Sequence, residues 1–374
     1  MSLGDHLPEQ SGPAEQCEWD SEGGEFTNVT SSEPITDWTH VFKKFNLDPA
    51  RFEIISDTVR CSTWQQSKRL ASGERDVVNL YSYRAQFRRK RDDRDIGHII
   101  DKVVASDIDI DMGGRDGVFV YAVGDLQLGK VDGDGTEGIV RRFRESLAAA
   151  VAEAKRCRSE YTHIYLPWLG DCVEGMVSMG GRNAWRTELT LTEQIDLLEN
   201  LMLMQVQEFA PLARRVVVSS VPGNHDETGR QFSPRVDDSH AVQALTSVGK
   251  ALSFGRDFDH VETVTPGRDE ATTVVEVAGT TFLTAHGHLW RRGRHWEWWE
   301  GQAFGRHAGG DADVLLAAHE HHFTVDTRSR RTFIRTPSFE SESTWWRHKT
   351  GQVGDPCGVV FLAEAGRVRG ITIV

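Results

Sequence analysis

The 374-residue sequence predicts an α/β protein, in which a large C-terminal domain follows a small N-terminal module. Two observations lead to this fold class. From residue 118 onward, short runs of β-branched and aromatic residues alternate with longer segments whose apolar residues have helical spacing. The last third of the chain adds several short strands in place of helices, so we expect a mixed sheet system. The sequence contains no internal repeat.

The domain that begins near residue 118 starts with a strand, a helix and a second strand. Residues 118–123 (VFVYAV) form a continuous apolar run, which is typical of a strand buried on both faces. Residues 138–157 carry apolar side chains on one face of an expected helix. Residues 164–169 (IYLPWL) form the second expected strand, and Pro167 marks its end or an edge position.

A capping box and a proline delimit the next expected helix. Thr190 and Glu193 match the pattern in which the first side chain of a helix and the side chain three residues later each bind the other's backbone N–H. Pro211 ends this helix, and residues 216–220 (VVVSS) form the third strand. The remaining expected strands are a hairpin over residues 272–285 and short strands over residues 314–317, 358–363 and 368–374.

Composition and charge divide the N-terminal part of the chain into three segments. We expect residues 1–35 to be a disordered acidic tail, because so few large apolar side chains cannot offset the entropy of ordering. Residues 36–91 are expected to fold as a small basic module, since residues 41–91 carry twelve Lys and Arg against five Asp and Glu. Residues 92–117 are charged and contain glycine, which predicts a linker to a domain spanning residues 118–374.

Cysteine usage and hydropathy exclude several classes of protein. The five cysteines are odd in number, far apart and without CxxC spacing, which argues against a disulfide framework or a thiolate zinc site. No apolar run approaches the roughly 18 residues of a membrane helix, so we expect no membrane partner. The first forty residues contain no Lys or Arg, which excludes a cationic targeting peptide. The expected location is therefore the cytoplasm.

Polar side chains follow five of the expected strands. In α/β sheets ligands bind at the carboxyl ends of the strands, where the loops converge. Carboxylates, amide oxygens and imidazoles together suit Mn²⁺, Fe or Zn²⁺, and an Asp that bridges two ions can help to clamp a phosphoryl group. Taken alone, Asp125 is better explained as a loop or cap residue and the block at residues 223–226 is also consistent with a turn, but the joint occurrence of the motifs favours a metal site. The side chains are Asp125 and Gln127, Asp171 and Glu174, Asn224, His225 and Asp226, His286 and His288, and His319, His321 and His322.

These blocks resemble the signature of the calcineurin-like metallophosphoesterases, which is D-x-H, G-D, G-N-H-[DE], H and G-H-x-H. The resemblance covers about residues 118–345 and implies a sandwich of two mixed β-sheets flanked by helices. Within the family the sequence is most similar to the bacterial and phage DNA-repair exonucleases of the SbcD/Mre11 group. The matching segments are Asp125-x-Gln127, Gly170-Asp171, Gly223-Asn224-His225-Asp226, His286-Gly287 and His319-x-His321.

The resemblance also implies a role for each residue. Two divalent cations are expected, with Mn²⁺ as the leading ion and Fe, Zn²⁺ or Mg²⁺ as alternatives. His225 would act as general acid, Glu174 would orient it, and Asp226 would hold its loop. The implied metal ligands are Asp125, Gln127, Asp171 and His321 for the first ion and Asn224, His286 and His319 for the second, with Asp171 bridging. The residues expected to face the substrate are His288, Trp290, Arg291 and His322.

Two residues depart from the family pattern. Gln127 stands where the family has histidine, and an amide oxygen is a weaker ligand than imidazole for Mn²⁺ or Zn²⁺. The first site is therefore expected to bind its ion loosely, to prefer a harder ion or to be vacant. Restoring histidine at position 127 should raise metal affinity or activity if Gln127 is a ligand. Ala318 replaces the glycine before His319, which is a small change.

Two segments are relevant to the class of substrate. The basic residues of the N-terminal module are interleaved with Trp64, Tyr81, Tyr83 and Phe87, as in surfaces that contact single-stranded nucleic acid. Ion pairs with the acidic tail or body explain the same charges. The segment of residues 290–299 combines Trp and Arg, as do Trp345, Trp346 and Arg347, and such side chains suit nucleotide stacking, a packed helix or a dimer contact.

The leading interpretation is a two-metal phosphoester hydrolase, and specifically a nuclease that cleaves DNA by attack of a metal-activated hydroxide. A phosphatase or small-nucleotide phosphodiesterase on the same site is the first alternative. A catalytically degenerate metal-binding scaffold is the second, and Gln127 is its sequence support. DNA is therefore the expected partner, with a homodimer or a partner subunit as a further possibility.

Overall fold

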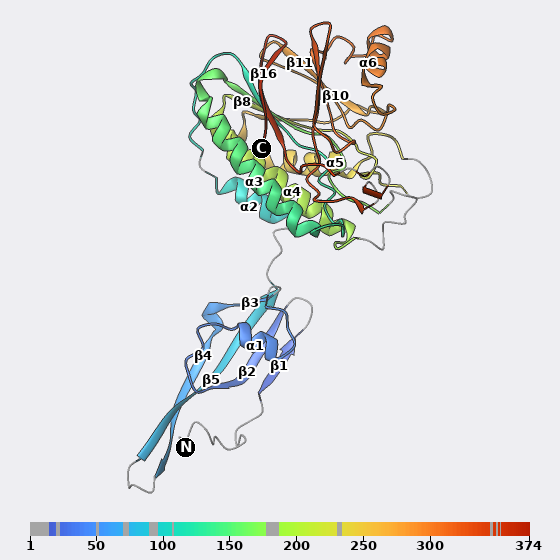
Figure 1. Ribbon diagram of the computed structural model, residues 1–374. Coiled ribbons are helices and arrows are strands. Elements are labelled where there is room, and N and C mark those ends of the chain that lie inside the picture. The colour runs from blue at the N-terminus through green and yellow to red at the C-terminus, as the bar shows by residue number, and fades with distance from the viewer. Residues whose placement is uncertain are drawn as a thin grey trace. The chain divides into compact units, whose positions relative to one another are not determined.

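A computed structural model gives the fold of most of the chain (Figure 1). The chain divides into two compact units, Met1–Asp92 and Asp93–Val374, which are described separately below. The residues that the structure describes are 15–19, 23–49, 52–69, 75–89, 96–106, 108–176, 187–229, 234–344, 347–348, 351 and 353–374.

The N-terminal unit is an antiparallel five-stranded sheet with one short helix. Its strands run in the order β1-β2-β5-β3, and β4 also pairs with the long strand β5. An aromatic cluster forms the core, where the ring of Phe26 lies 5.3 Å from that of Phe42 and 4.5 Å from that of Phe87. The elements are β1 (Gln16–Trp19), β2 (Gly23–Ser31), α1 (Thr39–Lys44), β3 (Phe52–Ile54), the 3₁₀ turn η2 (Ser56–Thr58), β4 (Arg60–Arg69) and β5 (Arg75–Arg89).

The expectation of a disordered tail is wrong for residues 15–19 and 23–35, because β1 and β2 belong to this sheet. Phe26 and Val29 of β2 are buried, and strand β5 supplies the backbone partners that a composition count cannot see. Residues 1–14 lie outside the described part of the chain. The small module is therefore larger than residues 36–91, and its structure is mostly β.

The C-terminal unit contains two mixed sheets that pack face to face. The first has the order β16-β15-β6-β7-β8-β9, with β6 to β9 parallel and β15 and β16 antiparallel. Its strands are β6 (Val118–Ala122), β7 (His163–Trp168), β8 (Arg215–Ser220), β9 (Val261–Val264), β15 (Val359–Glu364) and β16 (Arg367–Ile373). The second has the order β10-β11-β12-β14-β13, with β11, β12 and β14 parallel. Its strands are β10 (Thr272–Val277), β11 (Thr280–Ala285), β12 (Val314–Ala317), β13 (Thr324–Arg328) and β14 (Arg331–Arg335).

Alternation along β6 shows how the layers assemble. Val118, Val120 and Ala122 face the second sheet, whereas Phe119 and Tyr121 face a core that the helices cover. On the outer face of the second sheet, α6 packs through Trp299. The helices are α2 (Ile96–Val104), α3 (Gly135–Arg156), α4 (Leu191–Phe209), α5 (His240–Leu252) and α6 (His295–Phe304), with 3₁₀ turns η3 (Arg158–Glu160), η5 (Ala210–Leu212) and η6 (Arg256–Phe258).

This architecture confirms the expected fold class, an α/β sandwich of two mixed sheets flanked by helices. The capping box is also present, because Thr190 Oγ1 accepts from the Glu193 N–H and Glu193 accepts from the Thr190 N–H. The linker assignment is wrong for residues 96–104, which form α2. Ile99 and Val103 of this helix are buried in the core of the C-terminal unit, which therefore begins before residue 118.

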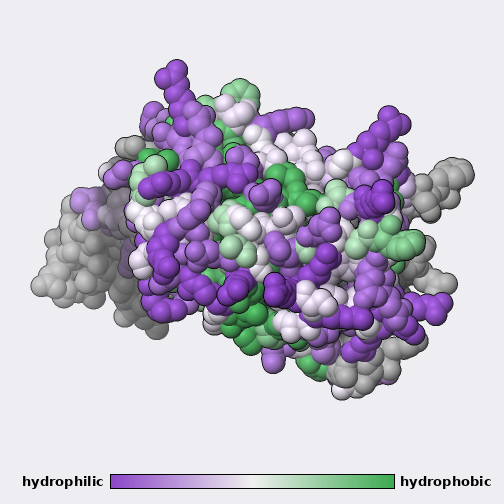
Figure 2. Space-filling model, turned by 90° about the horizontal axis from the view of Figure 1, so that it is seen from above, coloured by the Kyte–Doolittle hydropathy of each residue, from purple (hydrophilic) through white to green (hydrophobic). Residues whose placement is uncertain are grey.

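Figure 2 shows hydrophilic side chains spread over one face of the molecule, with separate apolar patches between them. Within the described parts of the chain, every helix is too short or too polar to cross a bilayer.

Candidate metal centre

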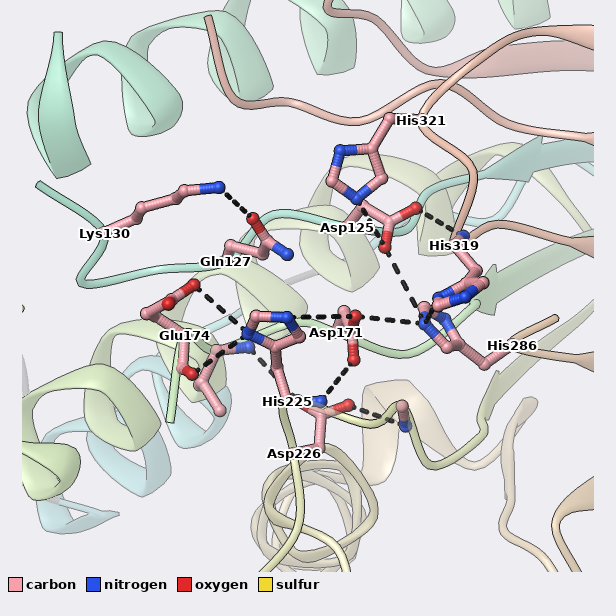
Figure 3. A network of polar contacts seen from close by, with 12 residues as sticks. Asp125, Gln127, Lys130, Asp171, Glu174, His225, Asp226, His286, His319 and His321 are labelled. Atoms are coloured by element: carbon pink, nitrogen blue, oxygen red, sulfur yellow. Dashed lines mark hydrogen bonds and ion pairs between the residues drawn. The ribbon is translucent and has the colours of Figure 1, made fainter. Parts of the chain in front are cut away.

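The two sheets bring their strand ends together at one site, as Figure 3 shows. The loops after β6, β7 and β8 come from neighbouring parallel strands of the first sheet, and those after β11 and β12 from neighbouring parallel strands of the second. Because the sheets pack against each other, five loops from distant parts of the sequence meet. The side chains that meet there include Asp125, Asp171, His225, His286, His319 and His321.

The backbone at this site is held in an unusual conformation. Five residues have left-handed φ angles, which are unfavourable for side chains other than glycine. Tertiary hydrogen bonds impose the conformation: the Asp125 N–H donates to the carbonyl of Gly170 and the Gln127 N–H to that of Asp171. Clustered strain of this kind is typical of functional sites. The residues are Asp125 (51°), Gln127 (49°), Asp171 (49°), His319 (70°) and His321 (57°).

Three potential ligands converge on one point. Atoms of Asp171, His286 and His319 all lie within 4.8 Å of one another. The Nδ1 of His286 lies 2.7 Å from the carbonyl oxygen of Leu169, which can only accept, so this nitrogen carries the proton. In the neutral form of His286 the lone pair is therefore on Nε2, which lies 3.1 Å from Asp171 Oδ2 and 3.2 Å from His319 Nδ1. The side-chain oxygen of Asn224 is buried and accepts no hydrogen bond.

Asp125 and His321 lie next to this group. The Oδ2 of Asp125 accepts from the backbone N–H of His319 at 2.7 Å, while its Oδ1 is buried without a hydrogen-bond partner. This orphaned oxygen lies 3.4 Å from His321 Nε2 and 3.9 Å from His286 Nε2. The other nitrogen of His321 lies 2.6 Å from Glu340 Oε1. A buried carboxylate oxygen without a donor is a position that a cation would satisfy.

Gln127 turns toward neighbours that the sequence did not indicate. Its side-chain oxygen accepts a hydrogen bond of 2.7 Å from the Lys130 ammonium, which also forms an ion pair with Glu340. Both Lys130 and Glu340 are buried. Neither residue carries a recognisable signal in the sequence, since Glu340 follows β14 and both residues lie outside the five blocks. The prediction that Gln127 ligates the first ion is untested, and its described contact is with Lys130.

His225 and Glu174 form the pair that the resemblance implied. The Nδ1 of His225 lies 3.3 Å from Glu174 Oε2 and 3.3 Å from the Glu174 carbonyl oxygen. The backbone N–H of His225 donates to Asp171 Oδ1 at 2.7 Å. Burial acts to lower the pKa of His225, but the charges of Asp171 and Glu174 outweigh it and raise the pKa to about 9.

Asp226 ties two of the loops together. Its Oδ1 accepts from the backbone N–H groups of Cys172 (3.0 Å) and Val173 (3.2 Å), and its Oδ2 accepts from that of Gly223 (3.0 Å). Burial, together with the nearby charge of Asp171, raises the pKa of Asp226 to about 7. The geometry is that of a residue that positions the loops after β7 and β8.

The pKa values of four histidines at the centre are shifted, two downward and two upward. Burial and the neighbouring His286 lower the pKa values of His288 and His319 to about 4, so both imidazoles are neutral and available as ligands. Burial also acts on His286 and His321, but Asp171 raises the pKa of His286 to about 9 and Asp125 raises that of His321 to about 10. Hard and borderline donors, orphaned oxygens and neutral imidazoles together fit a divalent cation.

The four residues expected to face the substrate have different positions. His288 lies beside the centre, with its ring 5.4 Å from that of His286, and its Nδ1 is buried without a partner. His322 contacts the Glu320 carbonyl through its Nδ1. Arg291 is exposed. Trp290 packs 4.6 Å from Trp298 in the cluster under α6, which agrees with the packed-helix alternative for this segment.

Several predicted contacts of the basic and aromatic segments lie outside the described parts of the chain. These are Lys90, Arg91, Trp345 and Trp346, and the side chains of Lys68, Arg69 and Arg89. Three other basic residues of the N-terminal unit are paired with acids of the same unit: Lys44 with Glu15, Arg84 with Glu25 and Arg88 with Glu53. Phe87 and Tyr83 belong to its core, whereas Trp64 is exposed.

This chain is similar to several solved structures. No family model matches the chain, and no curated protein sequence matches it. A conserved uncharacterised protein from Streptococcus pneumoniae, described as a predicted phosphoesterase, shares 11% identity over 66% of this chain and 83% of its own, with a TM-score of 0.29. A novel archaeal phosphodiesterase shares 13% identity over 68% and 99%, with a TM-score of 0.32. The Zn²⁺ complex of Vps29 from Entamoeba histolytica shares 12% over 68% and 98%, with a TM-score of 0.30.

Proposed function

We propose that this chain is a metal-dependent phosphoester hydrolase of the calcineurin-like type. The observation that carries the proposal is the joint geometry at the strand ends. Asp171, His286 and His319 offer ligand atoms within 4.8 Å of one another, and the His225 imidazole, fixed by Glu174, lies 4.0 Å from Asp171 Oδ2. A cation-binding group beside a positioned imidazole suits hydrolysis of a phosphoester.

The residues divide the work between binding and proton transfer. Asp171, Asn224, His286 and His319 would hold a divalent cation, which when bound supplies Lewis-acid activation of the phosphoryl group and of water. His225 carries a proton at neutral pH, because its pKa is about 9. Its Nδ1 faces Glu174, so Nε2 is the atom that would give a proton to the leaving oxygen. Asp226 holds the loops of Asp171 and Asn224 together through its three backbone contacts.

The substrate that we propose is a phosphodiester of nucleic acid, with DNA as the first candidate. Arg291 is exposed in the loop that follows His288, where a guanidinium can contact a second phosphate of a polynucleotide. In the N-terminal unit, Trp64 is exposed on β4 and offers a face for a base. The ion pairs of Arg84 and Arg88 within that unit leave their side chains more than half exposed, so they remain open to phosphate.

A substrate panel tests the proposal. The full chain, freed of metal by a chelator and reconstituted with Mn²⁺, is assayed on single- and double-stranded DNA, RNA, bis-p-nitrophenyl phosphate and p-nitrophenyl phosphate. Cleavage of DNA and of the diester is the expected result. Turnover of the monoester alone would indicate a phosphatase, and metal binding without turnover of any substrate would indicate a scaffold.

The His225→Ala variant tests the assignment of the general acid. Loss of a positioned proton donor costs about 10²- to 10⁴-fold in kcat, while the metal content should stay that of the wild type. His307→Ala is the matched control, because His307 is exposed and lies in the loop that precedes β12, whereas the centre uses the loop that follows β12. Equal activity of His225→Ala and His307→Ala would contradict the role of His225.

A further inference from the structure

A buried lysine stands beside the candidate centre. Lys130 lies in the loop between β6 and α3, where the residue is only 9% exposed. Its ammonium donates to Gln127 Oε1 at 2.7 Å and forms an ion pair with Glu340 Oε2. Lysine is almost never buried unless its charge is paired, so this position is a specific feature of the chain.

The lysine fixes the orientation of Gln127. An ammonium has three donors and no acceptor, so the oxygen of the Gln127 amide must face Lys130. Figure 3 shows the amide nitrogen of Gln127 on the side away from Lys130. An amide NH₂ group has no lone pair to offer a metal, and an oxygen already bound to one cation is a poor ligand for a second. Gln127 is therefore a partner of Lys130.

Glu340 extends this arrangement to the first set of ligands. One carboxylate oxygen of Glu340 contacts Lys130 and the other lies 2.6 Å from His321 Nδ1. His321 in turn lies 3.4 Å from Asp125 Oδ1. Across the described parts of the chain, the one trio of His, Cys, Asp or Glu atoms within 4.8 Å is that of Asp171, His286 and His319, which includes neither Asp125 nor His321. The Asp125–His321 side thus holds a fixed positive charge next to an incomplete set of ligands.

We propose that this chain binds one divalent cation, at Asp171, Asn224, His286 and His319, and that the Lys130 ammonium replaces the second cation as a fixed positive charge. This inference rests on the proposed hydrolase function and names the charge that acts on the Asp125–His321 side of the site.

The chemistry of an ammonium suits this role. Two of the three N–H donors of Lys130 are used by Gln127 and Glu340, and the described residues supply no acceptor for the third. That donor would bind a non-bridging oxygen of the substrate phosphate and stabilise the negative charge that grows there.

Metal stoichiometry provides the decisive measurement. Chelator-treated full chain is titrated with Mn²⁺ by calorimetry, and the bound ion is examined by electron paramagnetic resonance. One ion per chain with the spectrum of an isolated Mn²⁺ is the expected result, for the wild type and for Gln127→Ala alike. Two ions per chain, or the spectrum of a coupled pair, would overturn the single-ion inference.

Variants of Lys130 separate its charge from its packing. Lys130→Met should keep one ion per chain and lose about 10²- to 10³-fold in kcat, whereas Lys130→Arg should retain most of the activity. Since Lys130→Met leaves Glu340 without its partner, the double variant Lys130→Met/Glu340→Gln removes both charges and serves if the single variant does not fold. Lys155→Met, at an exposed lysine of α3, is the matched control. A Lys130→Met variant, or the double variant, that matches Lys155→Met in kcat would exclude the role of the ammonium.

The outcomes distinguish this inference from the proposed function. His286→Ala should abolish Mn²⁺ binding if the centre is at the strand ends at all. A folded wild type that binds no Mn²⁺ would refute the metal-dependent hydrolase itself. Two bound ions in an active wild type would refute only the substitution of the second ion by Lys130.

Discussion

The three backbone contacts of Asp226 make its replacement a sharp test of the site. The carboxylate accepts from Cys172, Val173 and Gly223, and all three groups are buried. A buried donor left without an acceptor costs about 1–3 kcal/mol. Asp226→Ala removes the acceptor of three donors, so we expect a loss of about 3–9 kcal/mol, a large share of the roughly 5–15 kcal/mol of a typical domain.

The asparagine variant isolates one of these contacts. Burial raises the pKa of Asp226 to about 7, so at pH 7 Asp226→Asn removes about half of a negative charge. Its remaining oxygen can still accept from Cys172 and Val173, whereas its NH₂ group would face the N–H of Gly223. Because the new NH₂ group and the Gly223 N–H face each other without an acceptor, we expect the free energy of unfolding to fall by about 1–3 kcal/mol, which is less than in the alanine variant.

Urea unfolding of the chelated protein measures these losses, and amide hydrogen exchange localises them. The amides of Cys172, Val173 and Gly223 should exchange faster in Asp226→Ala than in the wild type. Asp116→Asn is the control, since its side chain is 84% exposed. If Asp226→Ala stayed within about 0.5 kcal/mol of the wild type, the range of ordinary surface substitutions, the reasoning from these three contacts would be refuted.

Two further predictions concern burial and close packing. Burial raises the pKa of Glu199 from 4.5 to about 6, so the folded state binds its proton more tightly. The contribution of Glu199 to stability is full below pH 4.5 and is lost as the pH rises through 6. Between pH 4 and pH 7 the free energy of unfolding of Glu199→Gln should therefore rise by roughly 2 kcal/mol relative to that of the wild type. A difference between the two proteins that does not depend on pH would contradict this prediction. In Gly223→Ala the new Cβ would lie 2.1 Å from Asp171 Oδ1. We therefore expect the free energy of unfolding to fall by about 1–3 kcal/mol and Mn²⁺ to bind more weakly in a metal titration. Unchanged Mn²⁺ affinity would show that the loops can shift freely.

Much of the C-terminal unit could be predicted from the sequence, because its signals are local. Residues 118–122 are apolar throughout, as expected for β6, which is covered by a sheet on one face and helices on the other. The capping box at Thr190 places the start of α4 at the residue predicted. The five motif blocks lie at strand ends, where the backbone brings them together as expected.

The parts that could not be predicted depend on contacts between distant residues. Strand β2 contains only Phe26 and Val29 as buried apolar residues, and its stability comes from pairing with β5 far along the chain. Helix α2 lies between charged segments of the sequence, and its Ile99 and Val103 pack on a core formed by distant residues. Glu340 and Lys130 are separated by 210 positions, so neither residue indicates the other in the sequence. Buried charge pairs of this kind have no local pattern.

The left-handed backbone at Asp125, Gln127, Asp171, His319 and His321 has a consequence for how such a chain can evolve. At each of these positions glycine would relax the main chain, while only the side chain present contributes to the centre. The most stable sequence for this fold and the sequence with a working centre are therefore different sequences.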